Sequence, residues 1–526
     1  MPFHEQAREF LWFCAPALIL GFVLRVLMTW QMPYGYMQFD SADFLSTTAR
    51  FLSKGHFVIH SKRTFLVPLL YALPFIFKVP ALIVIPIFQH LLGLGIVLIT
   101  GLVARLWSQR WRWAIIPLTL FMAANPNLLW FEHALMSESV YLFCLFGLAL
   151  AATLFTRSAT ETHFKLLLLA LFFVAAARPE GRLMLGFGFF LLVLVDWGNW
   201  KILPRRLAWM IGITCITLPL TKTGQAGQLL YATVLPLAPD TSTVDPGFGE
   251  TVRPLRDELR ARQDGMMKLQ GLEQSLTDMT GEYLEAKGVV DPDTNDFCEK
   301  LAIEACLHQP WALPGLARRK FLLSAKGPVS IGYDEPRLQE KLNIGFNRKN
   351  MLGVLAKGLT GRELSDTPAV EAFVKDHYHP MPWFAFLDES WQRLTVANDN
   401  DITSKAMQVP NLPAFFVLAL LGAGVFLASP GPLQRFHIAW ILSLSGLWFA
   451  VELTGVVNPR YRFAFEPFCL IYATLGFLAA GVNAAAAARH FFAPAERTQV
   501  TRMAQPTRAR KTRDRTPATV PGSDCH

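Results

Sequence analysis

Long apolar segments recur along this chain, and they constrain its fold more than any other feature. About 20 consecutive apolar residues form a helix long enough to cross the hydrocarbon core of a membrane. The chain has 526 residues, of which 52% are hydrophobic and 17% are charged, and its mean hydropathy is +0.32. This composition excludes an ordinary soluble protein. The sequence therefore predicts an all-α polytopic membrane protein.

The apolar segments predict about ten membrane-spanning helices of roughly 20 residues each. The first begins at Phe10, and we expect a membrane helix rather than a signal peptide because no small-residue cleavage site follows it. A further apolar stretch, 65–78, contains Pro68 and Pro74, so we expect an interfacial helix there. The expected spans are 10–30, 80–104, 114–131, 138–156, 165–177, 183–197, 206–221, 411–429, 437–456 and 464–483.

The positions of Lys and Arg predict how these spans are oriented. Short loops rich in Lys and Arg stay on the cytoplasmic side of a membrane. With a cytoplasmic N-terminus, the most cationic short loops and the basic C-terminal tail all fall on that side. The opposite face then carries the loops around 40–43, 132–137, 178–182 and 458–462. Arginines in these outer loops run against the general bias and therefore need a local reason.

Four regions of different composition predict the domain organisation. Residues 1–221 form an N-terminal transmembrane module, and residues 411–483 supply the C-terminal transmembrane helices. Residues 222–410 are polar, lack a span-length apolar run and show helix-like spacing, which predicts a mostly helical extracytoplasmic domain. Residues 484–526 are rich in Arg, Thr and Pro, so we expect a disordered cytoplasmic tail near anionic lipid rather than a nucleic-acid-binding arm.

Acidic and basic residues gather in the predicted outer loops. Asp40 and Asp43 follow the first span directly, and carboxylates at the mouth of a helix bundle are costly to desolvate, so they need a partner or a role. Arginine recurs at the same face, and its guanidinium group binds phosphate through two parallel hydrogen bonds. The pattern therefore indicates a site for a phosphate-bearing substrate. The arginines concerned are Arg178, Arg182, Arg460 and Arg462.

Each of these residues also has an ordinary structural interpretation. Asp40 can cap a short helix, and Asp43 can favour the dipole of its first turn. The outer arginines can extend to lipid headgroups or to carbonyls at a helix end. For Glu138 we favour an ion pair with one of these arginines over catalysis. Arg25 lies inside the first span, where it either extends to the interface or pairs with a carboxylate.

Four stretches resemble, in the same order, the motifs of one enzyme family. They are DSADF at 40–44 with ARFL at 49–52, LMSES at 135–139, ARPEG at 177–181, and RYR at 460–462 with FEP at 465–467. The chain resembles the GT-C glycosyltransferases that use polyprenyl-phosphate sugars, similar to the family 39-like superfamily of protein O-mannosyltransferases and lipid A aminoarabinose transferases. The resemblance covers residues 1–220 and 411–483. It departs at Ser41 and Ser139, where the family commonly has Glu and Pro.

This resemblance implies a fold, a reaction and a set of site residues. The fold is a GT-C-like helix bundle, and the reaction moves a sugar from a polyprenyl-phosphate donor to an extracytoplasmic lipid, glycan or protein acceptor, with inversion at the anomeric carbon. Either Asp40 or Asp43 acts as the general base, and Asp40 is the better candidate. The expected ligands of the donor phosphate are Arg460, Arg462 and Arg178, with Glu138, Glu180 and Tyr461 in support.

The resemblance also implies partners, and the composition and charge bias indicate a location. The partners are the lipid-linked sugar donor, the acceptor and membrane lipids, with no nucleic acid. High Ala, Leu and Arg usage and a modest length indicate a bacterial inner membrane, and the Lys/Arg bias predicts that the active site lies on the periplasmic face and both termini in the cytoplasm. No cofactor is fixed by the sequence. The acidic pair can bind a divalent cation through its oxygens, but two carboxylates are too few to define a metal site.

Three other functions remain open on the sequence alone. An oligosaccharide ligase with a lipid diphosphate donor would also place arginines at the outer membrane face. A transporter or flippase of a lipid-linked or anionic substrate would show intramembrane charge, but usually with an internal repeat and broken helices at mid-depth, and neither is evident here. A non-catalytic subunit of an envelope complex could keep the same fold. The acidic pair in the first loop argues against the ligase and the non-catalytic subunit.

Overall fold

A computed structural model gives the structure of the chain. Within the residues that it describes, the regular secondary structure is helical, and an isolated parallel bridge joins Tyr36 to Ala134. The chain divides into two compact units, Met1–Ala479 and Ala480–His526, and the account below concerns the first. The expected tail lies outside the described residues from 493 onward. The described residues are 3–37, 41, 44–45, 47–48, 51–52, 64–108, 112–220, 226–261, 272–289, 294–318, 354–362, 367–379, 381–395, 414–428, 431, 433–454 and 459–492.

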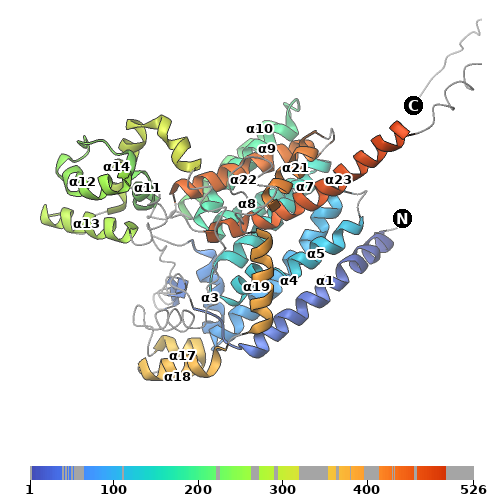
Figure 1. The fold of residues 1–526 in the computed structure, drawn as a ribbon, viewed down its shortest axis with the longest axis horizontal. Coiled ribbons are helices and arrows are strands. Elements are labelled where there is room, and N and C mark those ends of the chain that lie inside the picture. Colours follow the sequence, from blue (N-terminus) through green and yellow to red (C-terminus); the bar gives the residue numbers. More distant parts are fainter. Residues whose placement is uncertain are drawn as a thin grey trace, which may run out of the picture. The chain divides into compact units, whose positions relative to one another are not determined.

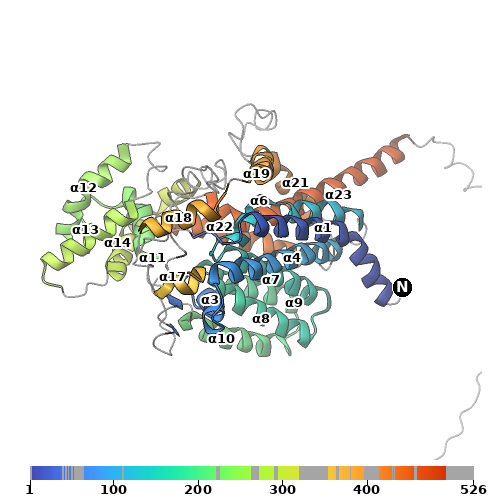
Figure 2. The ribbon, with the colours of Figure 1, turned by 90° about the horizontal axis from the view of Figure 1, so that it is seen from below.

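Three long helices are apolar enough to cross a membrane. They are α1 (Phe3–Gln31), α4 (Ala81–Trp107) and α7 (Glu138–Ser158). Helix α1 packs against α4, and α4 packs against α7 (Figures 1 and 2). Each coincides with an expected span, and this agreement supports a polytopic helical protein.

The expected span at 114–131 is bent in the middle. It consists of α5 (Ile115–Ala123), preceded by a short 3-10 turn, and α6 (Pro126–His133), with an angle of 46° between the two parts. Asn125 caps α6, since its side chain accepts hydrogen bonds from the backbone of Asn127 at 2.9 Å and Leu128 at 3.2 Å. Pro126 is favourable as the first residue of α6 but cannot continue α5. The pair counts as a fourth span only if both parts are taken together.

Helices also form at the other expected spans, but these helices are shorter or more polar. By length and composition, the described residues contain three membrane-crossing helices, or four with the bent pair, so the full set of about ten is not established. The expected interfacial stretch forms α3 (Leu66–Ile76). The helices at the remaining spans are α8 (Glu161–Ala177), α9 (Leu183–Asp196), α10 (Leu203–Leu220), α21 (Ala414–Ala428), α22 (Gln434–Thr454) and α23 (Glu466–Phe492).

Aromatic side chains join helices that are far apart in the sequence. Phe146 of α7 stacks on Phe468 of α23 with 4.5 Å between the ring centroids, and Trp440 of α22 contacts the same Phe468 ring at 5.1 Å. Trp440 also meets Phe187 of α9 edge to face. All four side chains are buried, and because lipid tails are as apolar as these rings, close packing rather than removal from water stabilises the contact. The N-terminal helices and the C-terminal helices therefore share one apolar core.

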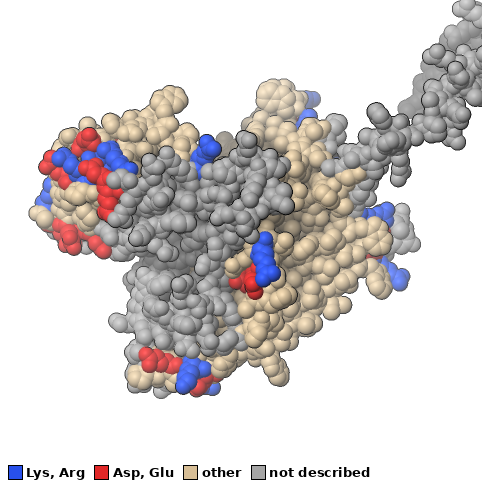
Figure 3. Space-filling model, viewed as in Figure 1, with Lys and Arg blue, Asp and Glu red and all other residues tan. Residues whose placement is uncertain are grey.

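A second group of helices has a core of its own. It comprises α11 (Ala226–Val234), α12 (Pro246–Ala261), α13 (Leu272–Ala286) and α14 (Thr294–His308). Phe248, Cys298 and Leu301 are buried among them. Charged side chains gather on the surface of this group, whereas the long apolar helices are largely uncharged between their ends (Figure 3). This group falls in the stretch for which the sequence predicts a polar helical domain.

Three smaller helices follow in the same polar stretch. They are α17 (Val354–Thr360), α18 (Thr367–His377) and α19 (Pro382–Thr395). Helix α19 buries one face, formed by residues spaced three or four apart as on one side of a helix. This face contacts α6 and α21 of the apolar bundle. Its residues are Phe384, Asp388, Trp391 and Thr395.

Candidate functional site

Residues 34–37, which follow α1, are fixed by hydrogen bonds to the segment between α6 and α7. The Tyr36 N–H donates to the His133 carbonyl at 2.9 Å, and the Leu135 N–H donates to the Tyr36 carbonyl at 2.8 Å. The Tyr378 hydroxyl donates to the Gly35 carbonyl at 2.9 Å. Two of the loops expected on one face of the membrane are therefore in direct contact at one end of the bundle.

Ser41, which stands between the two predicted catalytic acids in the sequence, contacts the second motif. Its buried hydroxyl donates to the sulfur of Met136 at 3.9 Å. The carbonyl of Met136 accepts hydrogen bonds from the Tyr71 hydroxyl at 2.9 Å and from Gln89 Nε2 at 2.8 Å. This part of the first motif is thus close to the second. Asp40 and Asp43 lie outside the described residues, and their catalytic role stays a prediction.

Arg178 is the centre of an ion cluster formed by the second and third motifs. Its Nη1 lies 3.0 Å from Glu138 Oε1, and its Nη2 donates to Glu180 Oε1 at 2.9 Å. Its guanidinium carbon lies 5.7 Å from the centre of the Tyr141 ring. Glu138 is the first residue of α7, and Arg178 follows the last residue of α8. The arginine pair that we favoured for Glu138 is therefore present.

A small pocket opens beside this cluster. Its walls include Glu138, Arg178 and Glu180, together with the apolar residues Leu447 and Val451. Phe465 of the fourth motif also lines it, with residues 463–464, which connect the two parts of that motif. The second, third and fourth motifs therefore meet around one cavity although they are far apart in the sequence. Among the described residues of this pocket one guanidinium faces two carboxylates, and these signs of charge differ from those of a simple phosphate site.

Arg462 has a different environment from Arg178. Its Nε donates to Glu466 Oε1 at 2.6 Å, and both side chains are fully buried. The second oxygen of Glu466 accepts from Asn127 Nδ2 at 3.2 Å and from Trp391 Nε1 at 3.5 Å. This arrangement connects α6, α19 and the start of α23. In this conformation the Arg462–Glu466 pair fits a structural role better than the phosphate contact expected from the sequence.

The other predicted site residues are less completely described. Arg460 and Tyr461 belong to the 3-10 turn Pro459–Ala464, but their side chains lie outside the described part of the chain. Arg182 extends from the turn after α8 and donates from Nε to the Pro179 carbonyl at 3.0 Å. Within the described residues, no group of three or more His, Cys, Asp or Glu side chains is placed to hold a metal ion.

The structure also reveals a buried polar network that the sequence did not predict. We expected residues 132–137 to form an outer loop, but Glu132 and His133 complete α6 and are fully buried. Glu132 accepts from Arg25 at 2.6 Å and lies 2.8 Å from His90 Nδ1. Arg25 therefore pairs with a carboxylate instead of extending to the interface. An arginine inside an apolar segment was the signal, since such a charge requires a partner.

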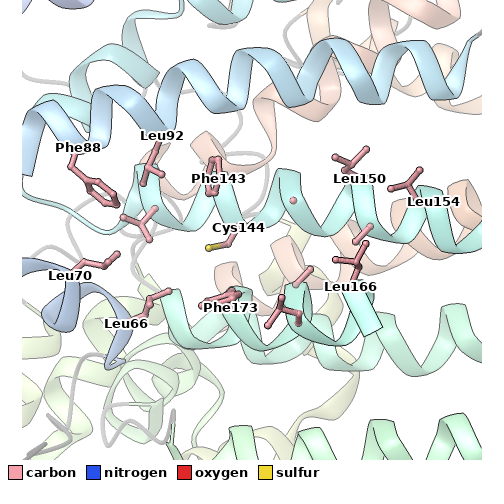
Figure 4. A pocket seen from close by; sticks show the side chains of 15 residues that line it. Leu66, Leu70, Phe88, Leu92, Phe143, Cys144, Leu150, Leu154, Leu166 and Phe173 are labelled. Carbon is pink, nitrogen blue, oxygen red and sulfur yellow. The ribbon is translucent and has the colours of Figure 1, made fainter. Parts of the chain in front are cut away.

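An apolar groove runs along the outside of α7, on a side adjacent to the ion cluster. It has a volume of about 420 Å³ and is lined by side chains of α3, α4, α7 and α8. Figure 4 shows Phe88 and Leu92 of α4 on one side and Phe173 of α8 on the other, with Cys144 between them. From Val140 to Leu154 it follows α7 for about 21 Å, at 1.5 Å per residue. Its dimensions and lining suit a hydrocarbon chain.

No family model matches this chain, and no curated protein matches it. The resemblance to the GT-C glycosyltransferases therefore rests on the four motifs and their order. What the structure adds is the position of those motif residues that it describes.

Proposed function

We propose that the protein is a membrane-embedded glycosyltransferase that uses a polyprenyl-phosphate sugar as donor. The acceptor is a lipid, glycan or protein on the extracytoplasmic face of a bacterial inner membrane. The observation that carries the proposal is the meeting of three motif stretches around the pocket of Glu138, Arg178 and Glu180. Ser41, from the first stretch, contacts Met136 of the second stretch.

The apolar groove supports a lipid-linked donor. Val140 lines the groove, and Tyr141, the next residue of α7, lines the polar pocket. Likewise, Phe173 of α8 lines the groove, and Arg178 follows directly after α8 ends. A donor with a phosphate head and a prenyl chain matches this adjacency of a charged pocket and an apolar groove. A soluble nucleotide sugar would not use the groove.

The proposed reaction needs one base and a means of stabilising the leaving phosphate. The acceptor hydroxyl oxygen bonds to the anomeric carbon, and the bond between that carbon and the phosphate oxygen breaks. The bonding electron pair leaves with polyprenyl phosphate, and Asp40 takes the hydroxyl proton, with Asp43 in support. Because the leaving group is already an anion, no acid is needed to protonate it. Guanidinium groups stabilise the charge that grows on it.

In this proposal the arginines are not equally well placed to bind the donor phosphate. Arg178 borders the pocket, so it can exchange a carboxylate for phosphate, but Glu138 or Glu180 must then move or take a proton. Arg462 is less suitable, because Glu466 holds it in a fully buried position. Arg460 stays a proposed ligand from its motif, with Tyr461 in support. Glu138 and Glu180 serve to orient the Arg178 side chain.

The test is sugar transfer by the purified protein in lipid vesicles. A panel of radiolabelled polyprenyl-phosphate sugars is offered with a membrane extract as acceptor, and the Asp40→Asn and Asp43→Asn variants are compared. We expect transfer from one donor, its loss in Asp40→Asn, and a smaller reduction in Asp43→Asn. Glu389→Gln, which changes an exposed carboxylate of α19, is the control and should keep full activity.

Two results would count against this function. Full activity of a folded Asp40→Asn protein would remove Asp40 as the base. Absence of transfer from every monophosphate donor would favour the diphosphate-dependent ligase or the transporter, which the same vesicles can test with diphosphate-linked sugars or with labelled lipid.

A further inference from the structure

A buried chain of polar side chains extends from α1 through α4 and α6 to the first loop. Arg25 donates to Glu132 at 2.6 Å, and Glu132 Oε2 lies 2.8 Å from His90 Nδ1. His90 Nε2 lies 3.1 Å from His133 Nδ1, and His133 Nε2 lies 3.2 Å from the carbonyl of Tyr34. The four side chains from Arg25 to His133 are buried.

The number of hydrogens in this series of hydrogen bonds follows from the groups at its two ends, Glu132 and the Tyr34 carbonyl. From Glu132 to Tyr34 there are three hydrogen-bond contacts, and each needs one hydrogen. The Tyr34 carbonyl can only accept, and an ionised Glu132 can only accept. Two neutral imidazole rings carry one N–H each, which supplies two hydrogens for three contacts. The third is an additional proton, held on Glu132, on His90 or on His133.

Two helix ends make this position favourable for a positive charge. Helix α5 ends at Ala123, whose carbonyl accepts from Arg25 at 3.5 Å, and α6 ends at His133. The C-terminal end of a helix carries the negative end of its dipole and stabilises a nearby cation. The carbonyl of Gly21, within α1, also accepts from Arg25 at 3.0 Å. These carbonyls offset the additional charge that burial would otherwise disfavour.

The other polar groups beside the network carry no opposing charge. Gln89 of α4 donates to Tyr71 of α3, and both are uncharged. His377 of α18 lies on the far side of Tyr34, whose ring it meets edge to face at 4.9 Å. Among the described residues, the ionisable side chains hydrogen-bonded to Glu132, His90 and His133 are these three and Arg25.

We infer that Arg25, His90, Glu132 and His133 hold one proton more than their neutral imidazoles and ionised carboxylate supply, so that every contact of the network carries a hydrogen, and that this complete network, through His133, fixes residues 34–37 in place. The His133 ring contacts the Tyr34 carbonyl, and the His133 carbonyl accepts from the Tyr36 N–H at 2.9 Å. The ring and the backbone carbonyl of His133 thus both bind the segment that leads toward the acidic motif at 40–43. His133 is a positioning residue in this inference, and its meaning for catalysis rests on the proposed function.

Nitrogen NMR on the full chain in lipid nanodiscs, labelled with ¹⁵N-histidine, tests the proton count without any activity assay. His90 and His133 can be recognised by the ¹⁵N–¹⁵N coupling across their shared hydrogen bond. We expect His133 Nε2 and His90 Nε2 to carry hydrogens at pH 7, with a hydrogen also present between His90 Nδ1 and Glu132. A bare His90 Nδ1 facing Glu132 at pH 7 would overturn the inference.

Amide hydrogen exchange at Tyr36 and Leu135 tests the effect on the first loop. Loss of one hydrogen bond of the network in His133→Ala should accelerate exchange by about tenfold. His133→Gln should restore much of the protection, because its amide N–H can still donate to Tyr34. The control is His437→Gln, which changes another buried histidine, one that is hydrogen-bonded to Tyr472. We expect unchanged exchange in the control.

The outcomes separate this inference from the proposed function. Unchanged exchange in His133→Ala would refute the positioning role, whether or not sugar transfer is observed. Loop release in His133→Ala with rescue in His133→Gln would support it even if no donor is used. Should neither variant fold, exchange in the unchanged protein decides. The inference expects the protection factors of Tyr36 and Leu135, which are corrected for base-catalysed intrinsic exchange, to fall once the pH is raised far enough to remove the additional proton from the NMR spectrum. Constant protection factors through that loss would overturn it.

Discussion

Arg25 and Arg178 both pair with glutamate, but in different surroundings. Arg25 and Glu132 are 3% and 0% exposed, and their remaining contacts are with His90 and backbone carbonyls. Arg178 is 12% exposed, faces two carboxylates and borders a pocket. The first arrangement directs its hydrogen bonds to other parts of the protein. The second retains an open side, and only there can a ligand exchange places with a side chain.

The charge balance of the two sites differs as well. With its additional proton, the Arg25 network carries one net positive charge inside the bundle. Among the described residues, the Arg178 cluster brings two glutamates to one guanidinium. An arginine at an outer membrane face is therefore not by itself a phosphate site, because neighbouring carboxylates can already occupy its donors. In both sites, the partners of the arginine determine its role.

The largest effect that we predict comes from removing one glutamate charge at each site. Glu132→Gln leaves Arg25 buried without its carboxylate partner, and breaking a buried pair in this way costs about 3–5 kcal/mol. Glu138→Gln leaves Arg178 with Glu180, so we expect a cost of about 1 kcal/mol. The measurement is thermal unfolding of the two purified variants in the same detergent, followed by tryptophan fluorescence.

Equal losses of stability in the two variants would contradict the difference that we describe between the Arg25–Glu132 pair and the Arg178 cluster. A second readout sharpens it, because Glu138→Gln frees donors of Arg178 and should strengthen binding of a polyprenyl-phosphate analogue. Glu132→Gln, away from the pocket, should leave that affinity unchanged in the fraction of protein that remains folded.

A smaller loss is predicted for Gly93→Ala in α4. A Cβ at Gly93 would lie 1.6 Å from Glu132 Oε1 and 2.7 Å from Arg25 Nη2. The Glu132 side chain is held by Arg25 and His90, so it cannot move aside without losing a hydrogen bond. We expect a cost of about 2–3 kcal/mol from this overpacking. Gly186→Ala in α9 is the matched control, because its Cβ would meet no atom within 4 Å.

Thermal unfolding again provides the measurement for this pair. We expect a lower midpoint in Gly93→Ala and no loss in Gly186→Ala, since alanine is the better helix former. An unaffected Gly93→Ala protein would mean that the Arg25–Glu132 pair tolerates displacement. The Arg25–Glu132 pair would then be no more rigid than the Arg178 cluster.

The positions of the helices could be predicted from the sequence to a large extent. In a membrane the backbone must satisfy its own hydrogen bonds, so an apolar segment of sufficient length has little choice but to form a helix. The break between α5 and α6 was missed, although an Asn-Pro pair at 125–126 is a recognised helix-start signal. The high hydropathy of residues 114–131 concealed it. How many helices cross the membrane depends on length and polarity together, which apolar runs alone did not resolve.

The candidate site could be predicted only in part, because its contacts have different ranges. The grouping of Glu138 and Arg178 followed from their expected membrane face. Arg462 and Glu466 are four residues apart, a spacing that allows an ion pair across one helical turn, but we did not predict this pair. Glu132 lies 107 residues from Arg25 along the chain, and no local spacing reveals such a pair. Long-range pairs of this kind require the packed structure.

The smallest effect that we predict concerns Asp388 of α19, a buried carboxylate with no arginine in contact among the described residues. Its Oδ2 accepts from Gln392 at 2.8 Å, and its Oδ1 has no hydrogen-bond partner within the described part of the chain. Burial raises the pKa of Asp388 to about 6, and the Gln392 hydrogen bond opposes that rise only in part. Because this pKa lies above the ordinary value for aspartate, ionisation of Asp388 costs stability. The cost is absent at low pH, grows as the pH rises from about 4 to 6, and is constant above that.

Asp388→Asn cannot ionise, so we expect it to stabilise the protein at pH 8 by up to about 2 kcal/mol, with the gain shrinking toward pH 4. Melting midpoints at several pH values measure this trend. The matched control is Glu389→Gln, which changes the exposed neighbour that pairs with Arg393 on the surface and should shift the midpoint by less than about 0.5 kcal/mol at any pH. A stabilising Asp388→Asn beside a destabilising Glu132→Gln would mean that burial alone does not set the sign of a carboxylate's contribution, and that the presence of a guanidinium partner does. If instead Asp388→Asn destabilised the protein at pH 8, Asp388 would have a cationic partner, and α19 would then hold a third arginine- or lysine-paired site like those of Glu132 and Glu138.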